Sequence, residues 1–261
     1  MIDTLLPFLG KYMPEINSAL GAGIVIFARV LGFVRYAPVV GRSEVPGQVK
    51  LSVALILTVI LTSILKPEMP EMGVSLMLSL ILNFAAGALL GFIANCLILA
   101  IEAGGDMINM QMGLSSAMVL DPTTSAQVSI VGKFFTLIAI ILFIHIGGIY
   151  WLITGLLKSF EIFPIYATSF PLEQLVNQKF LIQITSNILY IGLQIASPVL
   201  LATLGQDIIL GIISKTAPQI NVFQLSFLFK PVLGAAILIF ILPMIFEVIV
   251  EYYNSYSGLF Y

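Results

Sequence analysis

The chain contains a run of 28 residues, from Val74 to Ile101, that carries no charged side chain. A helix of about 20 apolar residues is long enough to cross the hydrocarbon core of a bilayer, which is about 30 Å thick. Two further runs, Phe134–Leu157 and Phe180–Gln206, are also long enough to cross a bilayer, and they contain no Asp, Glu, Lys or Arg. Backbone groups must be paired internally in lipid, so the three runs predict membrane helices.

Shorter apolar segments bring the expected total to six or seven, and they are Ala19–Val34, Leu51–Leu65, Ile208–Phe229 and Pro231–Phe246. The composition agrees with a membrane protein, because only 9% of the residues are charged, against about 25% in a soluble domain. The net charge of −2 gives no indication of a nucleic-acid partner. The acidic start, Met1–Asp3, and the missing Ala-x-Ala pattern predict no removable signal peptide.

Several polar groups fit poorly in a plain bundle of membrane spans. Arg29 lies in the middle of an apolar segment, where an isolated charge is costly. Amide side chains also interrupt the apolar runs, at Asn83, Asn95, Gln183, Asn187 and Gln194. We therefore expect these groups to contact partner subunits or other helices rather than lipid.

The residues that enzymes and metal sites require are scarce. The chain has one histidine, His145, and one cysteine, Cys96, so no catalytic residue, metal ligand or cofactor site is predicted. We expect His145 to be buried or to face a pore, with a hydrogen bond to a neighbour. Gly87 and Gly91 form a small-xxx-small pair, which is a common helix-packing device.

The most unusual stretch is Glu102–Gln127, which holds four of the ten methionines. Its glycines, Gly104-Gly105 and Gly113, are expected to interrupt a helix, and Asp121-Pro122 closes the stretch. Flexible methionines and small residues favour a loop that fills an irregular space and later moves. The alternative is a re-entrant or interfacial loop in which the methionines only fill space.

Two other stretches are distinctive. Pro198–Pro231 predicts a helix, a break and a second helix, and its simplest interpretation is an ordinary helical hairpin. Arg29–Lys50 carries four basic residues, two prolines and three glycines between two helices. It is either a positively charged cytoplasmic loop or a charged contact surface for a partner.

Together these stretches resemble the FliR family of flagellar export-gate subunits, which is related to the SctT proteins of injectisomes. The likeness covers about residues 20–240. The early pattern stands here as Arg29, Pro38, Pro46 and Lys50; the central signature as Ala103-Gly104, Gln111-Met112-Gly113 and Asp121-Pro122; the late signature as Pro198-Val199, Asp207, Gly211, Ala217-Pro218-Gln219, Asn221-Val222-Phe223 and Lys230. Ser159-Phe160 and Pro164 match a further element. The chain departs from many members in having Gly147-Gly148 where they carry Gly-His.

The resemblance implies an all-α membrane protein of helical hairpins, with one export-gate domain over residues 1–261. A FliP-like part would cover about 1–175 and a FliQ-like hairpin part about 176–261. The chain would combine with FliP and FliQ subunits and an FlhB-like subunit, rather than with copies of itself. This gate would lie in the bacterial inner membrane, within the flagellar basal body, and would pass unfolded polypeptides without acting as an enzyme.

The resemblance also assigns residues to two roles. A pore plug would consist of Gly104, Gly105, Met107, Met110, Gln111, Met112, Gly113, Met118 and Asp121. A partner interface would use Arg29, Pro38, Pro46, Lys50, Pro218, Gln219, Asn221, Phe223 and Lys230. The alternative interpretation of the whole chain is a self-contained secondary transporter for a small solute, which needs a polar site near the membrane midplane.

Overall fold

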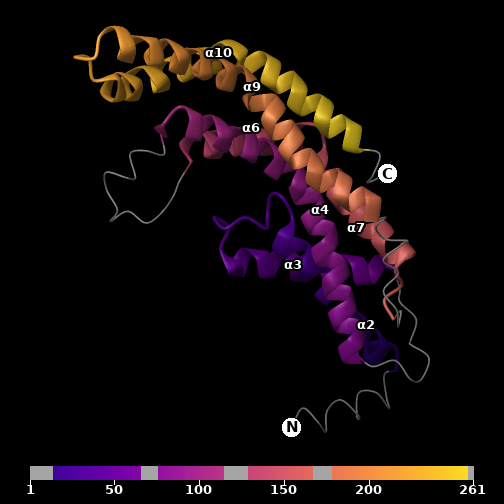
Figure 1. The fold of residues 1–261 in the computed structure, drawn as a ribbon. Coiled ribbons are helices and arrows are strands. Elements are labelled where there is room, and N and C mark those ends of the chain that lie inside the picture. The colour runs from indigo at the N-terminus through magenta and orange to yellow at the C-terminus, as the bar shows by residue number, and fades with distance from the viewer. Residues whose placement is uncertain (1–13, 66–75, 115–128, 167–177, 258–261) are drawn as a thin grey trace. The chain divides into compact units, whose positions relative to one another are not determined.

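The computed structural model describes residues 14–65, 76–114, 129–166 and 178–257. Within these ranges the chain forms helices and no strand (Figure 1). The seven described helices are α2 (Pro14–Tyr36), α3 (Gly47–Leu65), α4 (Leu76–Gln111), α6 (Ile130–His145), α7 (Gly148–Ile162), α9 (Gln178–Thr216) and α10 (Val222–Ser257). Four of them, α3, α4, α9 and α10, are long and apolar enough to cross a membrane, and α6 with α7 makes a fifth if the pair is one broken span. The predicted all-α membrane fold is confirmed.

The helices belong to two compact units. One unit holds α2, α3, the first part of α4 and nearly all of α7, and the other holds the last part of α4, α6, nearly all of α9, and α10. The division into a FliP-like and a FliQ-like part near residue 175 stays a prediction.

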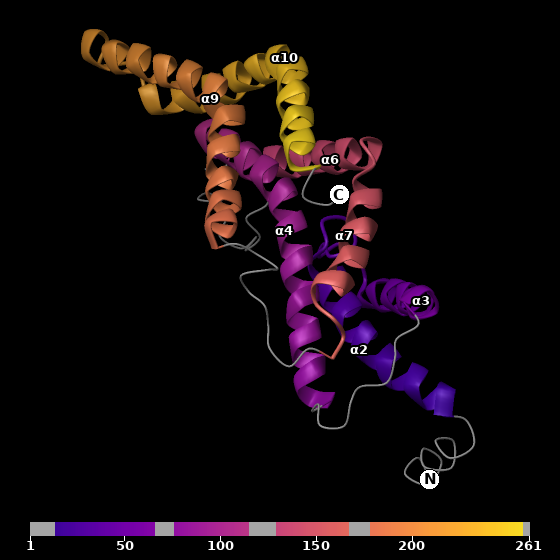
Figure 2. The ribbon, with the colours of Figure 1, turned by 90° about the vertical axis from the view of Figure 1, so that its right-hand side faces the viewer.

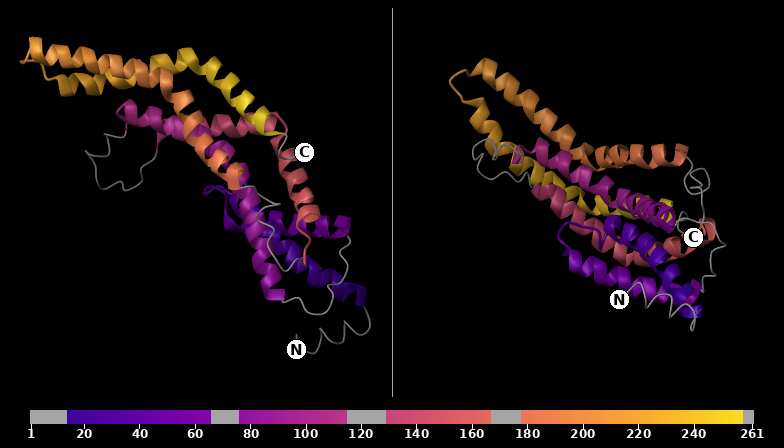
Figure 3. Two further views of the ribbon diagram at one scale, coloured as in Figure 1. Left: turned by 45° about the vertical axis from the view of Figure 1, so that its right-hand side comes forward. Right: turned by 90° about the horizontal axis from the view of Figure 1, so that it is seen from below.

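Glycines bring the helices of the first unit into backbone contact. A methyl group at Gly87 of α4 would collide with the carbonyl oxygen of Arg29 on α2, and one at Gly91 would lie 2.5 Å from the carbonyl oxygen of Phe33. Gly32 of α2 likewise lies against the α4 backbone at Phe84. The Gly87 and Gly91 pair therefore packs helices, as its spacing predicted. The third helix, α3, packs beside α2 (Figure 3).

The second unit uses the same device. Gly104 of α4 lies against Gly192 of α9, since a methyl group at Gly104 would be 3.0 Å from the Gly192 carbonyl oxygen. Gly105 packs against the backbone of α6, because a methyl group at Gly105 would lie 2.7 Å from the Cα of Gly132. The expected helix break at Gly104-Gly105 is wrong, because α4 runs unbroken to Gln111. Close packing on both sides, and not a turn, explains these two glycines.

The late stretch forms the expected helical hairpin, with a helix, a break and a second helix. One helix, α9, continues through Pro198 and the Gln206-Asp207 pair, and the break falls only at the turn of residues 217–221. Pro198 cannot donate to the Gln194 carbonyl, and the Ser197 hydroxyl donates to that oxygen instead, at 2.9 Å. The next helix, α10, contains Pro231 and Pro243 and bends along its length (Figure 2).

The predicted single run Phe134–Leu157 is two helices. Ile146 caps α6 by donating its backbone N–H to the carbonyl of Leu142, and Gly147 follows with a φ of 90°. A left-handed residue ends a helix readily when it is glycine. His145 lies in the last turn of α6 with its side chain exposed, so it is not buried within the chain, and the alternative that it faces a pore stays a prediction.

The glycine contact between α2 and α4 is testable. Gly87→Ala should lower the free energy of unfolding by about 1–3 kcal/mol, the usual cost of overpacking, because the added methyl collides with the Arg29 carbonyl. Gly21→Ala on α2 is the matched control, since a methyl there meets nothing within 4 Å. Denaturant unfolding of the purified chain in detergent measures both, and equal effects would contradict the packing described here.

Candidate functional site

Arg29 lies at the centre of a buried polar cluster in the first unit. Its side chain is 0% exposed, and its guanidinium donates five hydrogen bonds, all of them to neutral oxygens. Two go to the Asn83 Oδ1 of α4, at 2.6 and 3.0 Å. Two others reach the backbone carbonyls of Ser159 and Phe163, both at 2.7 Å. The ring of Phe160 lies 4.1 Å from the guanidinium carbon.

The Arg29 cluster shows how this chain accommodates a charge within an apolar segment. Ser159 is in the last turn of α7 and Phe163 follows that helix, so the cation meets the carbonyl-rich end of α7. Asn83 completes the network by donating to the carbonyls of Ser79 and Ile165, at 2.7 and 2.8 Å. This confirms that Arg29 and Asn83 find partners on other elements of the chain. The predicted contact of Arg29 with a partner subunit stays a prediction.

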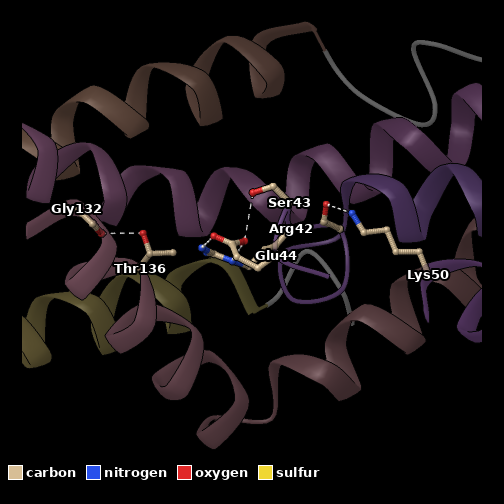
Figure 4. A network of polar contacts seen from close by, with 7 residues as sticks. Arg42, Ser43, Glu44, Lys50, Gly132 and Thr136 are labelled. Carbon is tan, nitrogen blue, oxygen red and sulfur yellow. Dashed lines mark hydrogen bonds and ion pairs between the residues drawn. The ribbon is translucent and has the colours of Figure 1, made fainter. Parts of the chain in front are cut away.

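The other early-pattern residues lie in and beside the connection between α2 and α3. Pro38 is buried and Pro46 is exposed. The Lys50 ammonium turns back on this connection and donates to the carbonyl of Gly41, at 2.9 Å (Figure 4). Arg42 pairs with Glu44 at 3.2 Å in the same figure. Much of the basic charge is therefore engaged locally, and the partner role of these residues stays a prediction.

In the second unit, the central and late signatures meet at one pocket. This pocket has a volume of about 330 Å³, and its lining comes from the end of α4 and the first turns of α10. The lining residues are Met110, Gln111, Met112, Gly113, Phe223, Ser226, Phe227 and Lys230. Six of these were assigned from the sequence, four to a plug and two to a partner interface. Nothing in the sequence indicated that the two groups would share a pocket.

The two methionines of the pocket differ in exposure. Met110 is 71% exposed, whereas Met112 is 4% exposed. Just after Met112, Gly113 adopts a φ of 73° and donates its backbone N–H to the Met110 carbonyl, at 3.0 Å. The chain therefore leaves α4 at a glycine in the left-handed conformation, as an interruption at Gly113 predicted.

One lining residue of the pocket, Lys230, takes part in a salt bridge. The Lys230 ammonium lies 2.8 and 2.9 Å from the two carboxylate oxygens of Asp207 on α9. Beside it, Pro231 has no N–H to donate to the Phe227 carbonyl, so the helix lacks one of its own bonds here. The pair joins the two helices of the hairpin near this weak point.

The turn of the hairpin carries the remaining late-signature residues. Pro218, Gln219 and Asn221 are exposed. The Asn221 side chain accepts the backbone N–H of Gln224, at 3.2 Å, and so caps the start of α10. This arrangement is the one expected of an asparagine at a helix N-cap.

Some assigned residues play no part in the pocket, and some pocket residues were not assigned. Gly104 and Gly105 pack inside the unit, and Met107 is half-buried on α4. Met118 and Asp121 lie outside the described residues. Ser226 and Phe227 were missed because they look like ordinary residues of an apolar helix. Among the described residues, no three His, Cys, Asp or Glu side chains gather as a metal site.

The Arg29 cluster predicts a large effect of mutation. Arg29→Ala should lower the free energy of unfolding by roughly 3 kcal/mol or more, because each buried polar group left unpaired costs about 1–3 kcal/mol. Arg42→Ala removes a surface pair and should cost no more than about 1 kcal/mol. Denaturant unfolding in detergent compares them, and a small loss for Arg29→Ala would show that the cluster contributes little.

The cap on α10 gives a second prediction. Asn221→Ala should destabilise the chain by about 0.5–2 kcal/mol, whereas Asn221→Ser should retain most of the stability because serine also caps helices. Thermal unfolding of the three proteins measures the difference. Equal losses for alanine and serine would show that Asn221 does not act through the cap.

Comparison with known proteins places these features in a family. The sequence matches the family described as "Bacterial export proteins, family 1" over residues 20–256, which is nearly the whole chain. It is 30% identical to the flagellar biosynthetic protein FliR of Bacillus subtilis (strain 168), across 91% of this chain and 92% of that protein. It is 28% identical to the flagellar biosynthetic protein FliR of Escherichia coli (strain K12), across 83% of this chain and 82% of that one. A shorter match, 29% identical over 58% of this chain, is to the surface presentation of antigens protein SpaR of Shigella flexneri.

The family match and the FliR relatives confirm the resemblance carried by the early, central and late signatures. With its long apolar helices, the chain is a multi-pass membrane protein. The match extends over the elements that build the Arg29 cluster and the pocket, and we conclude that the chain belongs to family 1 of the bacterial export proteins.

Proposed function

We propose that the chain is a subunit of the flagellar type III export gate in the bacterial inner membrane. Together with FliP and FliQ subunits and an FlhB-like subunit, it forms a pore through which unfolded flagellar proteins leave the cytoplasm. The substrate is a polypeptide, and the chain carries out no bond chemistry. The observation that carries this proposal is the pocket in which central-signature and late-signature residues come together.

The surface of the late hairpin supports assembly with other subunits. Large apolar side chains are exposed along it, including Ile209 at 59%, Leu228 at 62% and Val232 at 67%.

The end of α4 supports a role in closing the pore. A pore wide enough for an unfolded chain leaks ions when idle, so part of the gate must fill it without gripping the substrate. Met110 is exposed at the pocket and can conform to different neighbours, since its contacts amount to ~0.1–0.2 kcal/mol for each atom pair. The plug proposed here runs from this point through Met118 to Asp121.

The assembly role predicts an effect of reversing the charge at Lys230. Lys230→Glu should weaken both subunit assembly and secretion, because it places a carboxylate against Asp207 and removes the ammonium from the pocket. Co-purification with FliP-like and FliQ-like subunits and a swimming assay measure the two effects.

A charge swap separates a partner contact from a purely internal pair. Lys230→Glu combined with Asp207→Lys re-forms an ion pair within the chain but leaves the wrong charges facing a partner. We expect the swap to restore the stability of the chain and not the assembly of the complex. Full recovery of swimming would show that Lys230 only pairs with Asp207 and does not contact a partner subunit.

The plug predicts a leak. Deleting residues 115–120 should raise ion conductance of membranes that contain the assembled gate, while the complex itself stays intact. Conductance in vesicles is the measurement, and native electrophoresis of the complex is the control. Unchanged conductance in an intact complex would contradict the plug and favour the alternative, a connection whose methionines only fill space.

A further inference from the structure

The side chain of Met112 lies against a glycine of α10. A methyl group at Gly234 would be 2.5 Å from the Met112 Cγ, 3.0 Å from Sδ and 3.2 Å from Cε. Carbon atoms in good contact lie about 3.5–4.0 Å apart, so no larger residue fits at position 234 while Met112 stays in place. The thioether, from Cγ to its terminal methyl, therefore occupies the space that a side chain at position 234 would need.

This contact distinguishes Gly234 from two glycines on the other helix of the hairpin. A methyl group at Gly205 or Gly211 of α9 would meet nothing within 4 Å. Glycine in a helix interior is less stable than alanine, and close packing against a neighbour is one reason to keep it. Met112 supplies that reason at Gly234.

The position of Met112 gives the contact its consequence. Met112 follows the last residue of α4, Gln111, and precedes Gly113, where the chain turns out of the helix. Gly234 lies about one helical turn beyond Lys230 on α10. The anchor point and the Asp207–Lys230 salt bridge are thus neighbours on one stretch of α10, next to the proline at 231.

We infer that Met112 is a positioning residue, seated at Gly234 so that the direction in which the chain leaves α4 is set by α10. The two pocket methionines then have different tasks: Met112 anchors the end of α4, and Met110 stays exposed as part of the proposed plug. A shift of α10 near Lys230 moves Gly234 and so acts on Met112. The inference rests on the proposed function for its effect on the pore, but not for the contact itself.

A double-mutant cycle in the full export-gate complex tests the contact through its function. Gly234→Ala should raise ion leak several-fold, because its methyl expels the Met112 side chain. In a Met112→Ala background the same substitution should add nothing, since alanine at position 112 has no atoms beyond Cβ to be expelled. Gly205→Ala is the matched control and should leave the leak unchanged. Equal effects of Gly234→Ala in both backgrounds would overturn the inference.

A cysteine pair tests the contact independently of transport. In a Cys96→Ala background, Met112→Cys with Gly234→Cys should form a disulfide on mild oxidation. Met110→Cys with Gly234→Cys should not, because the three atoms nearest to a methyl group at Gly234 all belong to Met112. Failure of the first pair to cross-link would overturn the inference. Failure of the proposed function looks different: the loop deletion would leave conductance unchanged, while the disulfide would still form.

Discussion

Helices that carry almost no charge and are apolar on most sides have little to orient them against one another. In lipid, apolar faces gain no hydrophobic energy by packing together, and association depends on close backbone contact and on buried hydrogen bonds. Both units of this chain meet that requirement in the same way. Gly87 brings α4 onto α2 in one unit, and Gly105 brings α4 onto α6 in the other. The Arg29 cluster and the bond from the Tyr253 hydroxyl to the Ala139 carbonyl, at 3.0 Å, add the polar contacts.

The candidate site also depends on a small number of close contacts between helices. Two of the contacts at the pocket are small: the thioether of Met112 joins the end of α4 to α10 at Gly234, and the salt bridge from Lys230 to Asp207 joins α10 to α9. Neither is a large interface, and Pro231 weakens the helix between them. Small contacts of this kind suit the plug proposed above, because a plug must be placed accurately when the gate is idle and yet give way to a passing polypeptide.

Much of this fold was predictable from hydropathy, because an uncharged run such as Val74–Ile101 has few alternatives to a helix. The boundaries were less predictable. Gly104-Gly105 looked like a break, but tertiary contact fills both glycine positions. Inside α9, the Ser197 hydroxyl satisfies the carbonyl that Pro198 leaves free. The real break at Gly147 lay inside an apolar run, and only its backbone conformation marks it.

The site shows the same limit. Lys230 and Met112 could be singled out from the sequence, but their shared pocket depends on how α4 and α10 pack, which local patterns do not encode. Gly234 is a single glycine in an apolar helix, and its role appears only when the neighbouring thioether is seen.

The central claim is that this chain works as one part of a hetero-oligomeric gate. The most direct test is to purify the tagged chain from its native membrane in mild detergent and to determine the composition and mass of what accompanies it. The account predicts a stable complex with FliP-like and FliQ-like subunits in fixed proportion. A chain that is folded and stable alone, or only as a homodimer, would contradict it.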